Sequence, residues 1–65
     1  MGKIIKVGVY SEYFMPQDIW GYCVWAQTSS GKRYHLVAWS PTFVGTQYQA
    51  ESLLGTELDS NWIEV

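Results

Sequence analysis

The sequence has a single cysteine, Cys23, and a single histidine, His35. One cysteine cannot form an intramolecular disulfide, and one cysteine with one histidine cannot supply the usual four ligands of a structural zinc site. Small secreted domains usually carry several disulfides, so the scarcity of cysteine favours a protein of the reducing cytoplasm. We expect neither a metal nor an organic cofactor.

Long apolar runs are also missing from the chain. Residues 1–6 contain two lysines that are not followed by a long apolar stretch, so the N-terminus does not have the pattern of a signal peptide. Nowhere do about 20 apolar residues follow one another, as a membrane-spanning helix requires. The sequence therefore predicts a cytoplasmic protein with no membrane segment.

Basic residues are few, and the charges are unevenly distributed around a net charge of −2. A nucleic-acid-binding domain normally shows a basic stripe, and this chain has too few basic residues for one. The uneven distribution points to a protein partner, with a basic surface of its own. The basic residues all lie in the first half of the chain, and four of the six acids lie in the last fifteen residues: Lys3, Lys6, Lys32 and Arg33 against Glu51, Glu57, Asp59 and Glu64.

Aromatic residues, by contrast, are abundant: four tryptophans, five tyrosines and two phenylalanines occur in 65 residues. A chain of this length makes one domain and buries only about 60% of its unfolded surface, so its core is marginal. A buried aromatic side chain removes roughly 150–250 Å² from water. We therefore expect a folded single domain, residues 1–65, in which a few buried aromatic rings replace a larger aliphatic core.

The first half of the chain begins with a strand pattern. Residues 3–10 alternate apolar side chains with Lys6 and Gly8, which is the two-residue period of a half-buried strand. Pro16 lacks a backbone donor, so residues 11–18 are predicted to form a loop, although this segment is unusually rich in large apolar side chains.

A β-hairpin is predicted next, with arms at residues 19–28 and 32–40. The turn Ser29-Ser30-Gly31 would place its glycine in the left-handed position of a three-residue loop and set Thr28 opposite Lys32. Because side chains alternate between the faces of a sheet, this register assigns each residue to a face. One face would carry Trp20, Tyr22, Val24, Ala26, Tyr34, Leu36 and Ala38, and the other Gly21, Cys23, Trp25, Gln27, Arg33, His35, Val37 and Trp39.

A short helix and a last strand complete the predicted order. Thr46 and Gln49 fit a capping box, and Gly55 is a natural helix stop. Residues 61–65 have the composition of a final strand. The order β-β-β-α-β predicts an α+β fold, a small antiparallel sheet with one short helix packed on one face. The helix would pack through an apolar stripe at helical spacing: Ala50, Leu53 and Leu54.

Three groups of residues resemble catalytic or phosphate-binding motifs. Cys23 and His35 would be diagonal neighbours on one face, but no third residue orients the imidazole, and free cysteines are often simply buried. Glu57 and Asp59 are close in sequence, as two exposed acids often are without any catalytic role. The segment 31–33 lacks the glycine spacing of a phosphate-binding loop. We expect no catalytic residues and no enzymatic activity.

The aromatic pattern offers a better candidate site. If the helix covers the face of Tyr22, then Trp25, His35 and Trp39 lie on the open face, where tryptophan could anchor a protein partner or stack nucleobases beside Arg33. In an alternative arrangement, residues 11–18 fold back over these rings. A second candidate is an acidic patch that docks on a basic surface, with these members: Glu51, Glu57, Asp59, Glu64 and the terminal carboxylate.

Residues 20–65 also resemble a group of known proteins. The hairpin from Trp25 to Trp39, the helical segment 50–54 and the closing segment 59–64 look like those of small orphan proteins of phages, plasmids and other mobile elements. Several proteins of this group inhibit host defence, including anti-CRISPR proteins, which bind an effector subunit through an acidic or aromatic surface. The resemblance implies an inhibitor of a defence complex and maps no individual functional residue.

The leading hypothesis is a non-enzymatic protein-binding module that inhibits by steric occlusion. A single-stranded nucleic-acid-binding protein, stacking bases on the exposed tryptophans, is the alternative, and four basic residues offer it little counterion release. A homodimer that buries the open aromatic face is a third hypothesis. The partner-binding candidates are these: Trp25, His35, Trp39, Glu57, Asp59 and Glu64.

Overall fold

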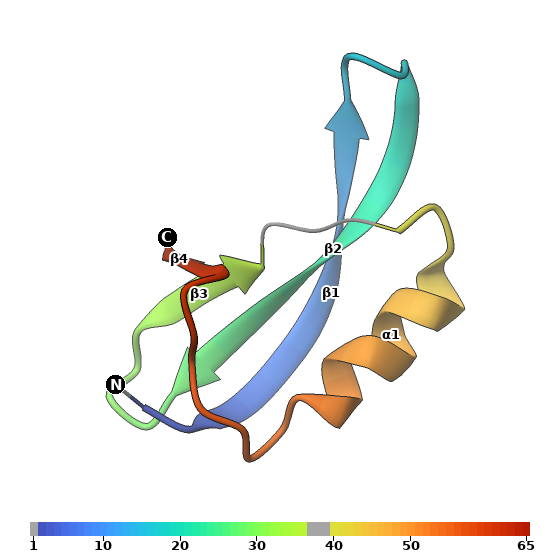
Figure 1. The fold of residues 1–65 in the computed structure, drawn as a ribbon. Coiled ribbons are helices and arrows are strands. Elements are labelled where there is room, and N and C mark those ends of the chain that lie inside the picture. Colours follow the sequence, from blue (N-terminus) through green and yellow to red (C-terminus); the bar gives the residue numbers. More distant parts are fainter. Residues whose placement is uncertain (1, 37–39) are drawn as a thin grey trace.

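The computed structural model describes residues 2–36 and 40–65 and shows a four-stranded antiparallel sheet with one helix (Figure 1). The strands lie in the order β1-β2-β3-β4, so each strand pairs with the strand that follows it along the chain. The helix lies between β3 and β4 in the chain, which confirms the predicted α+β class and element order. The elements are β1 (Ile4–Phe14), β2 (Ile19–Thr28), β3 (Arg33–Leu36), α1 (Phe43–Ser52) and β4 (Trp62–Glu64).

Near the turn, the hairpin of β2 and β3 has the predicted register, with Trp25 opposite His35. Farther along, the prediction is wrong, because Tyr22 pairs with Ser40 where counting from the turn places residue 38. Gly31 has φ +88°, a conformation that favours glycine, and its N–H donates to the Thr28 carbonyl at 3.0 Å. The Thr28 N–H in turn donates to the Lys32 carbonyl at 3.2 Å. β3 ends at Leu36, and the predicted face assignments of residues 37–39, Trp39 among them, lie outside the described residues.

The predicted loop at residues 11–18 is wrong, because β1 continues to Phe14 and pairs with β2 along its whole length. The turn occupies only residues 15–18, where Pro16 takes a position at which its fixed φ suits a turn. Asp18 closes the turn with φ +54°, a left-handed conformation that aspartate tolerates better than most residues. The strand before the proline ends at Phe14, four residues later than the predicted end at residue 10.

The predicted N-cap of the helix is also wrong. The helix begins at Phe43, one turn earlier, and Thr42 is the N-cap residue. Thr46 is buried inside the helix, where its hydroxyl donates to the Thr42 carbonyl at 2.8 Å. Thr42 makes no side-chain capping hydrogen bond, so the burial of Thr46 against the sheet, and not a capping side chain, accounts for the earlier helix start. Gly55, at φ +83°, follows the helix end as predicted.

The core lies between α1 and the β1–β2 part of the sheet. Thr46 and Ala50 of the helix are buried against this face, and the ring of Phe43 meets Tyr22 edge-on at 5.5 Å between centroids. The expected aromatic-rich core does not form: no aromatic residue in the described part of the chain is fully buried. The buried apolar residues are all small or aliphatic: Ile4, Cys23, Val24, Ala26 and Ala50.

The aromatic rings are therefore displaced towards the surface, for a geometric reason. Ala26 of the sheet and Ala50 of the helix are fully buried, so small side chains fill part of the layer in which aromatic rings were expected. The chain thus exposes large apolar side chains that folding alone does not require. In the described part of the chain no helix is long and apolar enough to cross a membrane.

Candidate binding site

The face of the sheet opposite α1 is open, and it carries Trp25 and His35 as predicted. The two residues are cross-strand partners in the middle of β2 and β3. They line a shallow concavity of about 300 Å³, whose other walls come from β1, β3 and the residue after β4. Residues 11–18 do not fold back over this face, because residues 11–14 are part of β1. The remaining lining residues are Tyr10, Glu12, Arg33 and Val65.

Trp25 is held in place by its neighbours on both sides. Gly8 is its cross-strand partner on β1, and a Cβ atom at Gly8 would come within 2.3 Å of the indole ring. The Arg33 guanidinium carbon lies 4.3 Å from the centroid of the indole, within the range of a cation–π interaction. Arg33 is itself oriented by Gln27, whose side-chain oxygen accepts from Nε at 3.3 Å. The indole is thus already stacked, and it is not a free platform for a base.

Cys23 lies on the same face but is buried, and its surroundings keep the thiol protonated. Its Sγ donates to the Glu12 carboxylate at 3.6 Å, and burial together with the Glu12 charge raises the pKa of the thiol. Burial and the neighbouring Cys23 and Glu12 likewise raise the pKa of Tyr10 to about 12. A nucleophilic cysteine needs a lowered pKa. The partner of the thiol is a carboxylate, not the imidazole of His35, so the arrangement is the reverse of an activated Cys–His pair.

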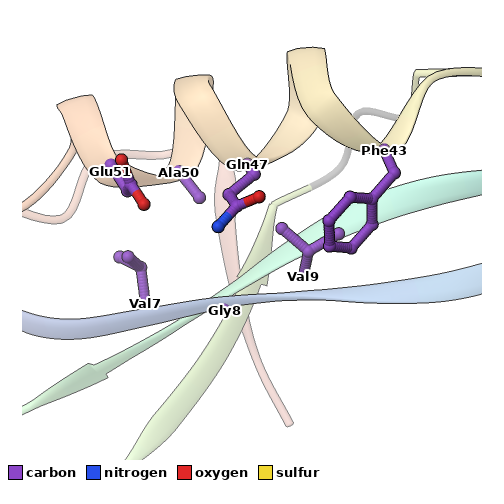
Figure 2. Close-up of a pocket in the computed structure, with 7 residues that line it drawn as sticks. All are labelled: Val7, Gly8, Val9, Phe43, Gln47, Ala50 and Glu51. Carbon is purple, nitrogen blue, oxygen red and sulfur yellow. The ribbon is translucent and has the colours of Figure 1, made fainter.

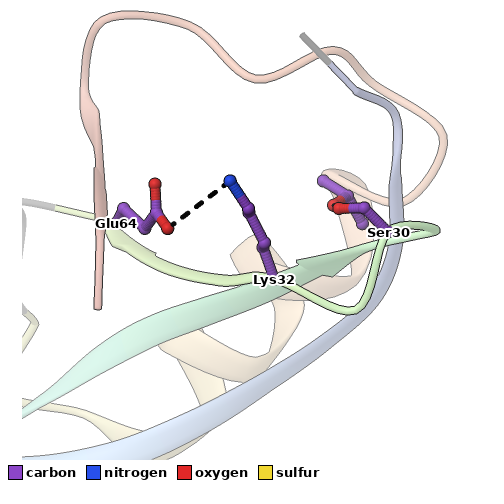
Figure 3. A network of polar contacts seen from close by, with 4 residues as sticks. Ser30, Lys32 and Glu64 are labelled. Atoms are coloured by element: carbon purple, nitrogen blue, oxygen red, sulfur yellow. Dashed lines mark hydrogen bonds and ion pairs between the residues drawn. The ribbon is translucent and has the colours of Figure 1, made fainter.

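The three acidic candidates do not gather around the aromatic ones. Glu64 is the cross-strand partner of Tyr34, whereas Ile63 is the partner of His35, so Glu64 points to the opposite face of the sheet from His35. The Glu64 carboxylate lies 3.9 Å from Lys32 Nζ, and both side chains are more than half exposed (Figure 3).

The other two acids lie in the connection between α1 and β4. Glu57 pairs through its main chain with Lys3, and the Asp59 carboxylate accepts the N–H of Asn61 at 2.9 Å. Glu57 and Glu64 therefore each have a lysine as a neighbour. Of these acids, only Glu64 has an ion pair within the part of the chain that the structure describes, and an acidic residue whose charge is balanced locally contributes little to long-range attraction, so the predicted acidic patch is weaker than the sequence implied.

An exposed apolar surface lies on residues 13–20, of which sequence reasoning had assigned residues 13–18 to a loop. Residues 13–20, the hairpin arm, form the far end of the β1–β2 hairpin and project beyond the rest of the molecule (Figure 1). Met15 and Trp20 are 77% and 66% exposed, and Tyr13 and Ile19 are also exposed. None of the four basic residues belongs to the arm or its flanks, and its only charged residues are Asp18 and the adjoining Glu12.

The arm is ordered by contacts between its own strands. The rings of Tyr13 and Trp20, directly opposite in the ladder, are tilted by 57° with centroids 5.5 Å apart. The Tyr13 hydroxyl donates to the Asp18 carboxylate, and this hydrogen bond raises the pKa of Tyr13. A signal for this arm was present in the sequence, since large apolar residues flank Pro16 on both sides, as two paired strands around a turn would place them.

A second hollow lies between α1 and β1, with a volume of about 160 Å³ (Figure 2). Val7 and Val9 point up from β1, and Phe43, Gln47 and Glu51 point down from the helix. Sites for drug-sized ligands are usually about 300–1,000 Å³. This hollow is too small for such a ligand, and it lies at the free edge of β1.

The described part of the chain thus offers an apolar arm, an open face with a pre-stacked tryptophan, and the edge of β1. Comparison of the chain with protein-family models, with curated proteins and with solved structures finds no match.

Proposed function

We propose that the chain is a non-enzymatic protein-binding module that acts by steric occlusion and binds its partner mainly through the hairpin arm. The exposure of Met15 and Trp20 on an ordered arm that projects from the domain is the observation that carries this proposal. Tryptophan and methionine are enriched at protein–protein interfaces, where rigid or adaptable apolar side chains fill pockets of the partner.

Folding gives the arm little reason to be apolar. β3 pairs with β2 at residues 25–27, so in the part of the chain that the structure describes the arm is a two-stranded ribbon with no third strand beside it. Isolated two-stranded ribbons gain little stability in water, and polar residues would serve such a ribbon better. The large apolar side chains at its tip therefore support a role in recognition.

The charges of the arm favour a partner with basic groups around an apolar cleft. Glu12 and Asp18 flank the exposed rings, and no basic residue occurs between Lys6 and Lys32. Complementary charges at the rim of an interface accelerate association and select the partner. The partner chemistry is the one expected from the sequence, but the carboxylates that would meet it differ from Glu57, Asp59 and Glu64.

The single-stranded nucleic-acid alternative has less support. Trp25 is already stacked against Arg33, and Lys32 lies beside Glu64. Trp20 is exposed enough to stack a base, but no basic residue in its vicinity along the chain would hold the phosphates. Phosphate neutralisation supplies most of the affinity of such proteins.

The cellular setting is part of the same proposal. A lone buried thiol, Cys23, suits a reducing cytoplasm. The resemblance to small proteins of mobile elements makes inhibition of a host defence complex a function that a compact occluding module could serve.

Affinity capture from a bacterial lysate, with and without nuclease, tests the proposal. Trp20→Ala and Met15→Ser should each abolish retention of a stoichiometric protein, whereas the control Leu54→Ser, at an exposed apolar residue after the helix, should retain it. Retention that disappears with nuclease would favour the nucleic-acid alternative. A protein retained equally by all variants would show that the arm is not the binding element.

A further inference from the structure

The outer edge of β1, a strand of 11 residues, forms one border of the sheet. β1 is the terminal strand of the sheet, and at its start Ile4 is bonded on the outer side, donating to the Thr56 carbonyl at 2.9 Å and accepting from the Gly55 N–H at 2.8 Å. In the described part of the chain this edge is unpaired between Lys6 and Ser11. It contains no proline up to Phe14, although natural proteins usually interrupt or cover such edges.

The ladder identifies which main-chain groups point outward from β1. The Tyr22 N–H and carbonyl are bonded to Ser40, on the β3 side, so the partner of Tyr22 on β1, Ser11, directs its own N–H and carbonyl away from β2. Because direction alternates along an antiparallel strand, the same holds for Val7 and Val9. These three residues present free donors and acceptors in a row.

We propose that this edge pairs with the same edge of a second copy, antiparallel and centred on Val9, to form a continuous eight-stranded sheet. A two-fold axis at Val9 places Val7 opposite Ser11 of the other copy, so outward-pointing groups meet outward-pointing groups. Such matching is the condition for an antiparallel hydrogen-bonded ladder.

The side chains select this register by their chemistry. With Val9 on the axis, Lys6 lies opposite Glu12 of the other copy, and this pair occurs twice. Tyr10 lies opposite Gly8, where the absence of a side chain leaves room for the ring. Moving the centre by one residue to Tyr10 would set Lys6 opposite Phe14 and remove both ion pairs.

The helix also fits a second copy across the axis. α1 packs about equally on β1 and β2, so its axis lies roughly half a strand spacing inside β1. The two helices of a dimer would then lie about two strand spacings, roughly 10 Å, apart, which is close to ordinary helix packing distances. Phe43 lies above Val9 (Figure 2), and Phe43 and Val44, 48% and 74% exposed, would be covered near the axis.

This dimer differs from one that buries the open aromatic face, and it adds to the proposed function. The strands run antiparallel, so the two hairpin arms would project from opposite ends of the joint sheet. Both arms would remain free to bind, which gives a bivalent module.

The test is the mass in solution of the full chain by sedimentation equilibrium, at concentrations up to about 1 mM. A dimer is expected for the wild type. Lys6→Glu should raise the dissociation constant of the dimer by about tenfold or more, because it sets a glutamate opposite Glu12 of the second copy. The double variant Lys6→Glu/Glu12→Lys should restore it. Lys3→Glu is the control, because it makes the same charge change beside residues 55–57, outside the paired segment.

Several results would overturn the proposal. A wild type that stays monomeric up to the highest concentration excludes the dimer, and equal weakening by Lys6→Glu and Lys3→Glu excludes the register. Amide hydrogen exchange gives a second readout, in which the Val7, Val9 and Ser11 amides should gain protection as concentration rises. Protection that appears on β4 instead would place the interface elsewhere. Circular dichroism of each variant verifies that it is folded.

Discussion

At the scale of single residues, the open face is organised around Trp25 and Gly8. The indole occupies the space that a side chain at position 8 would need. An aromatic ring laid over a cross-strand glycine is a known way of stabilising a strand pair that the glycine weakens. Gly8 is thus required by a tertiary contact. In the sequence it is only one of the residues that alternate with the apolar side chains of the strand.

We expect Gly8→Ala to lower the free energy of unfolding by about 1–3 kcal/mol, because the new methyl group must displace the indole. In a Trp25→Ala background the same change should be neutral or stabilising, since alanine suits a strand better than glycine. Urea unfolding of the four proteins of this double-mutant cycle measures the coupling. Equal costs in the two backgrounds would show that the ring does not constrain position 8.

The cluster of Tyr10, Glu12 and Cys23 should lower the free energy of unfolding at alkaline pH. The pKa of Tyr10 is about 12 in the folded chain against an ordinary value of 10.0, so the folded state retains a proton that the unfolded state loses. The contribution of Tyr10 to stability should therefore be constant below about pH 10 and be lost as the pH rises towards 12. The raised pKa of Cys23 adds a loss of the same sign, beginning near its ordinary value of 9.0.

Tyr10→Phe should flatten the part of this profile between about pH 10 and pH 12, because phenylalanine has no proton to lose. Chemical denaturation at a series of pH values measures it. If the variant and the wild type lose stability in parallel across this range, Tyr10 does not carry the effect.

At the scale of elements, the hairpin arm is separable from the domain. The rings of Tyr13 and Trp20 in the arm pack on each other, and no residue of the arm belongs to the buried core. Glu12 and Gly21 are paired immediately before the arm, so a two-residue turn could close the hairpin there.

Replacement of residues 13–20 by Asn-Gly should therefore leave a folded domain, with a free energy of unfolding within about 1 kcal/mol of the wild type. Partner capture should be lost in the same protein. Thermal and urea unfolding test the first expectation, and capture tests the second. An unfolded product would mean that the arm is needed for the fold, and its apolar side chains would then have a structural explanation.

At the scale of the whole molecule, the distribution of charge and apolar surface follows the long axis. The hairpin arm is apolar and acidic, and the basic residues lie towards the opposite end, at the start of β1 and around the turn between β2 and β3. The Cα extents of 35 × 21 × 17 Å reflect this elongated form. In the proposals made above, the arm end of the molecule binds the partner, and the exposed edge of β1 pairs with a second copy.

Much of the fold was determined by local sequence patterns. The alternation in residues 3–10, the turn at residues 29–31 and the stop at Gly55 each reflect backbone chemistry within a few residues, so the class, the element order and the β2–β3 register were predicted correctly. The placement of Trp25 and His35 on the open face followed from that register. Local rules suffice here because the turn type sets the register of a hairpin.

Only the tertiary structure decided the remaining features, because they depend on residues distant in the sequence. The pairing of Phe14 with Ile19 turned a predicted loop into an arm, and helix packing chose Thr42 over Thr46 as the cap. The thiol of Cys23 found a carboxylate from another strand rather than an imidazole. Small buried residues, Ala26 and Ala50 among them, fill part of the layer between helix and sheet, and no described aromatic ring is fully buried there.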